Sequence, residues 1–156
     1  MTTIDEIAAG RSDIARSILE RLPQWFGRPE SLAAYVSAAA DLPMFAARTT
    51  DGTVIGFLSI KEQTAVAVEA LVLGVLPEHH RSGVGRALFA HAERVMAQGG
   101  YRYLTVKTLA ASHPDANYAA TRRFYEAIGF APLEVFPTLW DPETPCLFMV
   151  KLLPRP

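Results

Sequence analysis

The chain has 156 residues, of which 50% are hydrophobic and 20% charged, a composition typical of folded proteins. Fifteen Lys and Arg balance sixteen Asp and Glu, so the chain lacks the basic excess of a general nucleic-acid binder. No apolar run approaches the ~20 residues of a membrane span. We therefore expect neither a nucleic-acid partner nor a membrane partner, and one domain over residues 1–156 is the simplest organisation.

The N-terminal segment carries acidic residues and interrupts its apolar runs, which is unlike a secretory signal. Cys146 is the single cysteine, so an intrachain disulfide is excluded and the reducing cytoplasm is the expected compartment. Within the apolar segment PCLFMV, this residue is expected to belong to the core.

A first helix is predicted near the N-terminus. Ile14, Ile18 and Leu22 recur every fourth residue, the spacing of one helix face. Ser12 or Asp13 is expected to cap this helix, because short polar side chains satisfy the free N–H groups of a first turn.

A second helix is predicted to begin at Pro29, since proline suits the first position of a helix. Leu32, Tyr35, Val36 and Ala39 give this helix an apolar stripe.

Strands and helices then alternate along the chain. Asp51-Gly52 predicts a hairpin between two strands, because the turn needs positive φ angles. Gly99-Gly100 and Gly129 are expected to close two later helices. A proline-rich connection through Trp140 is expected to join the last two strands. The predicted elements form a mixed α/β fold with parallel and antiparallel strands: strands 44–50, 53–61, 65–75 and 101–109, helices 85–98 and 116–128, and final strands near 133–136 and 146–152.

Residues 77–89, PEHHRSGVGRALF, connect a predicted strand to a predicted helix. A helix N-terminus attracts phosphate, and Gly83 and Gly85 would let the backbone approach it closely. Arg81 and Arg86 add positive charge at the same place. The stretch indicates either a phosphate-binding turn or a tight turn with solvated arginines. It lacks the Lys-Ser/Thr of a Walker loop and the third glycine of a dinucleotide fingerprint.

Four features in chain order carry a resemblance to a known family. They are a strand ending in Val75-Leu76-Pro77, the turn Arg81-Ser82-Gly83-Val84-Gly85-Arg86, the helix after it, and the segment RFYEAIGF at 123–130. Across roughly residues 54–130 the chain resembles the GNAT superfamily of acyl-CoA-dependent N-acetyltransferases.

The resemblance implies a GNAT-like mixed sheet of about six to seven strands, splayed in the middle, with about four helices on its faces. The first strand would be at best a stub at residues 2–4. In this family a strand such as the one ending at Leu73 and Val75 pairs with pantetheine, in a cleft where it splays from the strand at 101–109.

The resemblance also implies which backbone groups hold the pyrophosphate of CoA: the N–H groups of Arg81, Ser82, Gly83, Val84, Gly85 and Arg86. The chain departs from the family at His80, where the turn usually begins with Gln or Arg. Tyr118, which stands where relatives often have Asn, is also expected to lie beside the cofactor.

Acetyl transfer to an amine needs a group that removes a proton, since an alkylamine has a pKa near ~10.4. Glu69 lies between apolar neighbours on a predicted strand, where relatives often place an acid, and it is the candidate general base. The alternative is a charge on the solvated face of the strand.

The thiolate leaving group needs a proton or a hydrogen bond. Tyr125 fits this role and occupies the position where many relatives place the general acid. The alternative is an ordinary core tyrosine with a satisfied hydroxyl group.

The acceptor side follows from the resemblance alone. The segments that surround the acceptor in this family carry the aromatic side chains Trp25, Phe26, Tyr35, Phe136 and Trp140. Four acids, Glu69, Glu134, Asp141 and Glu143, are expected to attract a cation. The four histidines lack zinc-ligand spacing, so no metal is expected.

The sequence therefore predicts a cytoplasmic N-acetyltransferase that moves the acetyl group of its co-substrate acetyl-CoA directly to a primary amine of a small molecule. A protein or peptide acetyltransferase acting on Lys or an N-terminus remains an alternative, as does a non-catalytic acyl-CoA-binding sensor domain. The sequence leaves open whether the protein forms a homodimer.

Overall fold

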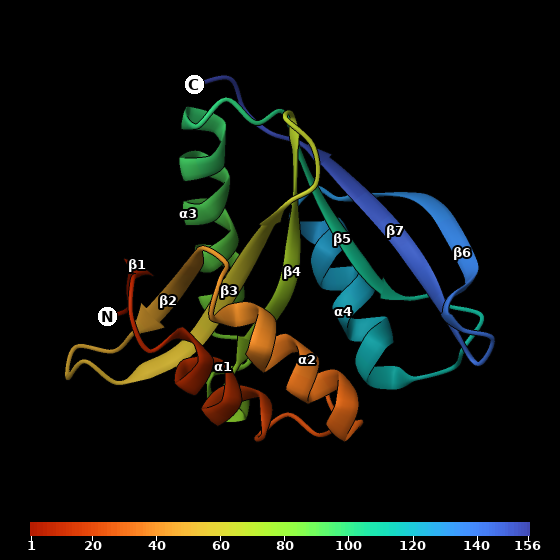
Figure 1. Cartoon of the computed structure of the whole chain (residues 1–156), viewed down its shortest axis with the longest axis horizontal. Coiled ribbons are helices and arrows are strands. Elements are labelled where there is room, and N and C mark those ends of the chain that lie inside the picture. Colours follow the sequence, from red (N-terminus) through yellow and green to blue (C-terminus); the bar gives the residue numbers. More distant parts are fainter.

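A seven-stranded mixed sheet with strand order β1-β2-β3-β4-β5-β7-β6 forms the centre of the molecule (Figure 1). The computed structural model describes all residues from 1 to 156. The expected fold, a splayed sheet of six to seven strands with four helices, is confirmed. The strands are β1 (Thr3–Ile7), β2 (Met44–Arg48), β3 (Val54–Glu62), β4 (Ala67–Val75), β5 (Tyr103–Leu109), β6 (Ala131–Asp141) and β7 (Thr144–Leu152). The α-helices are α1 (Arg11–Leu19), α2 (Pro29–Ala39), α3 (Val84–Gln98) and α4 (Ala116–Ala127), and a short 3-10 turn spans Pro77–His79.

Apolar side chains fill both faces of the sheet. Neighbouring residues of β2 show the division, because Phe45 packs with α3 and α4 whereas Met44 packs with α1 and α2. Successive side chains of a strand point to opposite faces, so the two helix pairs cover opposite faces of the sheet. None of the helices combines the length and the apolar composition that a membrane crossing needs.

Strand β4 contains an irregularity in its pairing with β3. Ser59 lies opposite Val72 and Ile60 lies opposite Ala70, so Leu71 is an extra residue without a partner. Such a bulge bends its strand and increases the local twist. The bulge thus accounts for a change in the direction of β4 in the middle of the sheet.

Strands β4 and β5 are the parallel pair, and they stay together for only three residues. Residues 67–69 pair with residues 103–105, and the pairing ends just before the bulge at Leu71. Strand β5 instead remains paired with β7 along its whole length. Figure 1 shows β4 and β5 close at one end and diverging towards α4.

The N-terminal elements differ from the sequence-based expectation in two details. Gly10, with a φ of 74°, precedes the first turn of α1 and no side chain caps it, so the predicted cap at Ser12 or Asp13 is wrong. Strand β1 is longer than the expected stub, because Thr3–Ile7 pairs with β2 over five residues.

The C-terminal hairpin also differs from the expectation. Strand β6 continues through Trp140 to Asp141, so the predicted proline-rich connection through Trp140 is wrong, and a turn of two residues, Pro142 and Glu143, joins the strands. The pairing of β6 with β7 shifts register between Phe136 and Asp141, and the proline at 137 lies within this stretch. Proline lacks a backbone N–H and is tolerated in edge strands and at such irregularities.

Candidate functional site

A cavity of about 690 Å³ opens where β4 and β5 diverge. Its wall combines the segment between α1 and α2, strands β4 and β5, the turn before α3, helix α4 and the end of β6. The structure places twelve of the predicted site residues on this wall: Trp25, Phe26, Leu73, Val75, Arg81, Gly83, Val84, Gly85, Arg86, Tyr118, Tyr125 and Trp140. It does not place Glu69, Ser82 or Phe136 there.

The turn before α3 forms one end of the cavity and presents unpaired backbone donors. The first helical hydrogen bond runs from the Ala87 N–H to the Gly83 carbonyl at 3.0 Å. The N–H groups of the six residues 81–86 therefore donate no hydrogen bond within the protein. Unpaired N–H groups at a helix N-terminus carry partial positive charge and bind anions.

Two residues of this turn have left-handed backbone conformations, Arg81 with a φ of 61° and Gly83 with a φ of 86°. Such a conformation is uncommon for a residue with a side chain and occurs frequently at ligand-binding sites. At Gly85 the requirement is space, because a Cβ atom would lie 3.1 Å from Cζ of Phe124. Both glycines thus keep the backbone of the turn close to the cavity.

His80 fixes the turn to the end of β4. Its Nε2–H donates to the Val75 carbonyl at 2.7 Å, and its ring meets the Trp25 ring edge to face at 5.7 Å. The ring of His80 therefore contacts the protein itself.

The open edge of β4 provides a second set of free backbone groups. The Leu76 N–H donates to Ile55 in β3 at 2.9 Å, and alternate residues of an antiparallel strand bond the same neighbour. Leu73 and Val75 therefore direct their N–H and C=O groups away from β3, towards the space that β5 has left. An extended chain in the cavity can pair with Leu73.

Tyr125 lies on α4 at the same wall. Its ring packs against Phe89, Phe124 and Phe130 with centroid distances of 5.6 to 5.9 Å. Burial raises the pKa of its hydroxyl group well above the ordinary value, so the hydroxyl stays protonated and can donate a hydrogen bond. The side-chain hydroxyl of Thr108, also on this wall, is buried without a partner.

Glu69 lies behind the wall and is ion-paired. Its side chain is 5% exposed, and its Oε2 lies 3.0 Å from Nζ of Lys107 on β5. The Lys107 side chain is 28% exposed and lines the cavity. Glu69 is thus not the charge on a solvated strand face that was the alternative interpretation, and of this ion pair only Lys107 lines the cavity.

Aromatic side chains and hydrogen bonds join the α1–α2 segment to α4 at the other end of the cavity. The Trp25 Nε1–H donates to Thr121 at 3.1 Å, and the Tyr118 hydroxyl donates to the Trp25 carbonyl at 3.0 Å. Burial, followed by the charges of Tyr35 and Asp115, raises the pKa of Tyr118 to about 12. Trp25 is thereby held against the helix that carries Tyr125.

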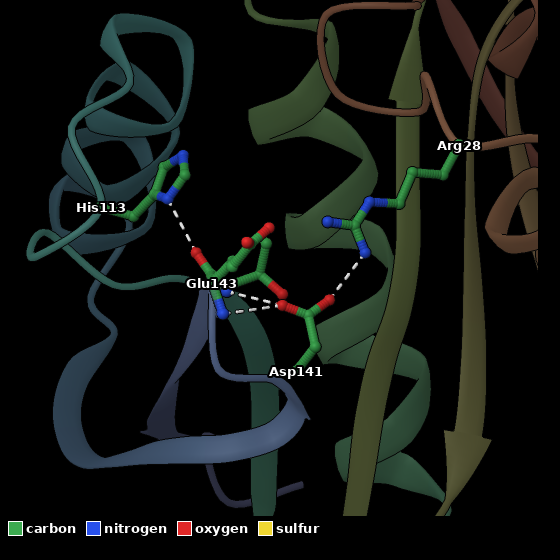
Figure 2. Close-up of polar contacts among 5 residues, drawn as sticks. Arg28, His113, Asp141 and Glu143 are labelled. Atoms are coloured by element: carbon green, nitrogen blue, oxygen red, sulfur yellow. Dashed lines mark hydrogen bonds and ion pairs between the residues drawn. The ribbon is translucent and has the colours of Figure 1, made fainter.

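An ion pair links the α1–α2 segment to the β6–β7 turn across the same end (Figure 2). Nη1 of Arg28 lies 2.7 Å from Oδ2 of Asp141, and Oδ1 of Asp141 accepts from the backbone N–H groups of Glu143 and Thr144. The Arg28 guanidinium, and then the bond from Thr144, lower the pKa of Asp141 to about 2. On the other side of the turn, His113 contacts the Glu143 carbonyl at 2.8 Å.

The predicted acceptor residues are only partly brought together. Phe136 packs against Phe148, with ring centroids 6.0 Å apart, and does not line the cavity. The four acids expected to attract a cation are also absent from the wall, and two of them, Glu69 and Asp141, have cationic partners within the protein.

Sequence reasoning missed Lys107 and Thr108. The available signal was a single cation in the otherwise uncharged strand YLTVKTL. A lone Lys in a strand usually faces solvent, and only the divergence of β4 from β5 turns this position into a cavity wall.

The chain matches the model of the acetyltransferase (GNAT) domain over residues 40–132, more than half of its length. None of the curated protein sequences matches it.

Several solved structures share the fold. A protein assigned to the GNAT family from Desulfovibrio desulfuricans is 20% identical with a TM-score of 0.83, covering 99% of this chain and 100% of its own. The ribosomal-protein-S18-alanine N-acetyltransferase of Escherichia coli is 21% identical with a TM-score of 0.76, covering 100% and 96%. An aminoglycoside 6'-N-acetyltransferase complexed with coenzyme A is 20% identical with a TM-score of 0.76, covering 99% of each chain. With the match of the domain model, the chain belongs to the GNAT family of acetyltransferases.

Proposed function

We propose that residues 1–156 form one N-acetyltransferase domain that transfers the acetyl group of acetyl-CoA directly to a primary amine of a small molecule. The observation that carries this proposal is the run of unpaired N–H groups at 81–86, which opens into the same cavity as the free edge of β4 and the Tyr125 hydroxyl. These groups fit the pyrophosphate, the pantetheine amides and the thioester sulfur of one extended ligand.

In this proposal the turn binds the pyrophosphate, and Arg81 and Arg86 add charge at the same end. The free N–H and C=O groups of Leu73 bind the pantetheine arm as a neighbouring strand would. Acetyl-CoA supplies the acetyl thioester.

In this proposal two side chains accept and donate the protons that move during the transfer. The carboxylate of Glu69 takes the proton that the acceptor amine loses, and Tyr125 donates its hydroxyl hydrogen towards the sulfur that leaves. Burial raises the pKa of Tyr125, so its hydroxyl keeps the proton and acts on the leaving sulfur as a hydrogen-bond donor.

The size of the cavity favours a small acceptor over a folded protein. Trp25 and Trp140 line the acceptor end of the cavity, and the Arg28–Asp141 ion pair joins the two segments that carry them. A peptide N-terminus is the second candidate, since a flexible chain end also fits a cavity of this size.

Release of free thiol from acetyl-CoA, measured across a panel of small amines and short peptides, tests the proposal. We expect release that depends on a small amine and exceeds the rate of hydrolysis without an acceptor. Release of thiol only in the presence of peptides would instead indicate that the protein acetylates peptides. Binding of acetyl-CoA with no release for any acceptor would indicate a non-catalytic sensor domain.

A further inference from the structure

The charged side chains on the cavity wall are all cationic and are divided between its two ends. Arg81 and Arg86 lie at the turn that is proposed to hold phosphate, and Lys107 is the one charged residue on the rest of the wall. No Asp or Glu lines the cavity. An acceptor in this cavity therefore meets an ammonium group and no exposed carboxylate.

The Lys107 ammonium is fixed and still has free donors. It carries three N–H bonds, of which one points to Glu69 at 3.0 Å. The ring of Phe148 lies 6.0 Å from Nζ. The position is two residues beyond Thr105, where the pairing of β5 with β4 ends. The ammonium thus stands at the vertex of the two diverging strands, with donors available to an anionic group.

We infer that the acceptor is an amine that carries a carboxylate on the carbon next to the amino group and an apolar body, as an apolar α-amino acid does. The inference rests on the proposed function and adds the substrate class. The carboxylate bonds to Lys107, and the apolar body packs among Trp25, Phe26, Tyr35 and Trp140, which line the same cavity.

The paired charges at the vertex match such a zwitterion. In this inference Lys107 receives the carboxylate, and Glu69, whose Oε2 lies 3.0 Å from Nζ of Lys107, takes the proton of the adjacent amine. A polycationic amine, in contrast, would bring positive charge to a wall that has no carboxylate to pair with, and an unpaired buried charge is costly.

Matched acceptors test the inference. The rate of thiol release is measured with L-phenylalanine, its amide and 2-phenylethylamine, with the corresponding leucine series, and with spermidine as a polycation. The amide has the same shape as the amino acid, and its less basic amine is more often neutral, so a preference for the amino acid cannot come from amine ionisation. We expect kcat/KM for the free amino acid of the better series to exceed that for its amide by about tenfold or more.

Variants then assign the preference to Lys107. Lys107→Met keeps an unbranched side chain one atom shorter and removes the charge, and Lys107→Arg keeps the charge. Lys107→Met leaves the buried carboxylate of Glu69 unpaired. The double variant Lys107→Met/Glu69→Gln is therefore measured as well. The ratio of the amino acid to its amide is compared within each protein, so a change in turnover common to both acceptors cancels. The ratio is expected to fall to about one in both methionine variants and to persist in Lys107→Arg.

Three results overturn the inference while leaving the proposed function in place: an amide or decarboxylated amine that is used as well as the amino acid, a preference for spermidine, or a ratio that the methionine variants do not change. Binding of acetyl-CoA without release for any of these acceptors also overturns it. Failure of acetyl-CoA to raise the melting temperature would instead contradict the proposed function itself.

Discussion

The two ends of the cavity are built in opposite ways. The phosphate end comes from seven of the eight consecutive residues 79–86, which belong to a single turn and the first turn of α3. The acceptor end comes from the α1–α2 segment, β5, α4 and the end of β6, which are up to 115 residues apart between Trp25 and Trp140. The first end depends on backbone conformation and the second on tertiary contacts.

This difference separates cofactor binding from acceptor choice. Backbone N–H groups recognise phosphate irrespective of the side chains around them, so the phosphate end is tied to one ligand. Side chains such as Lys107 and Trp140 form the acceptor end, and we expect a change in either of them to leave the turn intact. Changes at the phosphate end should therefore abolish cofactor binding, and changes at the acceptor end should alter acceptor use alone.

The largest expected effect is at the glycines of the turn. Gly83→Asp and Gly85→Asp each place a carboxylate among the N–H groups of 81–86, and at Gly85 the new Cβ would also lie 3.1 Å from Phe124. We expect the rise in melting temperature caused by acetyl-CoA to disappear in both variants. Gly52→Asp is the matched control, since Gly52 has a similar φ of 89° in a hairpin away from the cavity. A full rise in either turn variant would contradict the assignment of this end.

Removal of the Tyr125 hydroxyl should have the next largest effect. Tyr125→Phe keeps the ring packed against Phe89, Phe124 and Phe130, so the free energy of unfolding should change by no more than about 1 kcal/mol. We expect kcat to fall on the order of 10²-fold and acetyl-CoA affinity to stay within a few-fold. Tyr101→Phe, whose hydroxyl bonds to Glu62, is the control. Unchanged turnover in Tyr125→Phe would make this tyrosine structural.

Glu69→Gln should lower turnover in a manner that depends on pH. We expect a loss on the order of 10²-fold at pH 7, with partial recovery as the pH rises towards 9 and more acceptor is neutral. Acetyl-CoA binding should persist, because Glu69 lies far from the turn along β4. The exposed Glu62→Gln is the control. An identical profile from pH 6 to 9 for the variant and the wild type would remove Glu69 from the mechanism.

The Arg28–Asp141 ion pair should have the smallest effect. Both side chains are substantially exposed, and such pairs add little to stability. Arg28→Ala should therefore change KM for the acceptor by a few-fold and leave acetyl-CoA affinity unaltered. Arg16→Ala, which removes an exposed pair with Glu20 on α1, is the control. An effect on acetyl-CoA affinity as large as that on KM would contradict the separation of the two ends.

The Arg28–Asp141 ion pair contributes to stability over a defined pH range. The folded-state pKa of Asp141 is about 2, below the ordinary value of 3.8. Its contribution to stability is therefore complete above the ordinary pKa and is lost as the pH falls towards 2. The acceptor KM should accordingly not respond to this pair between pH 6 and 9.

The sequence predicted the parts that depend on neighbouring residues. Gly83 and Gly85 within one turn indicated a phosphate site, because the requirement for positive φ and close approach is local. The hairpin at Asp51-Gly52 and the start of α2 at Pro29 were predictable for the same reason.

The parts that depend on the sheet were not predictable. The extra residue Leu71, which bends β4, appears only when β3 and β4 are placed in register. The pairing of Lys107 with Glu69 depends in turn on the side-by-side position of β4 and β5. Trp140 was expected in a connection, because the proline at 137 argued against a strand there. Strand β6 includes this proline, since proline is tolerated in an edge strand where the pairing is irregular.

A crystal structure of the chain with acetyl-CoA bound is the most direct test of the central claim, that cofactor and acceptor meet where β4 and β5 diverge. We expect the pyrophosphate oxygens to accept hydrogen bonds from the N–H groups of 81–86, the pantetheine arm to pair with Leu73, and the sulfur to lie near the Tyr125 hydroxyl. A cofactor bound outside this cavity, or strands β4 and β5 paired through to Val75, would contradict the claim.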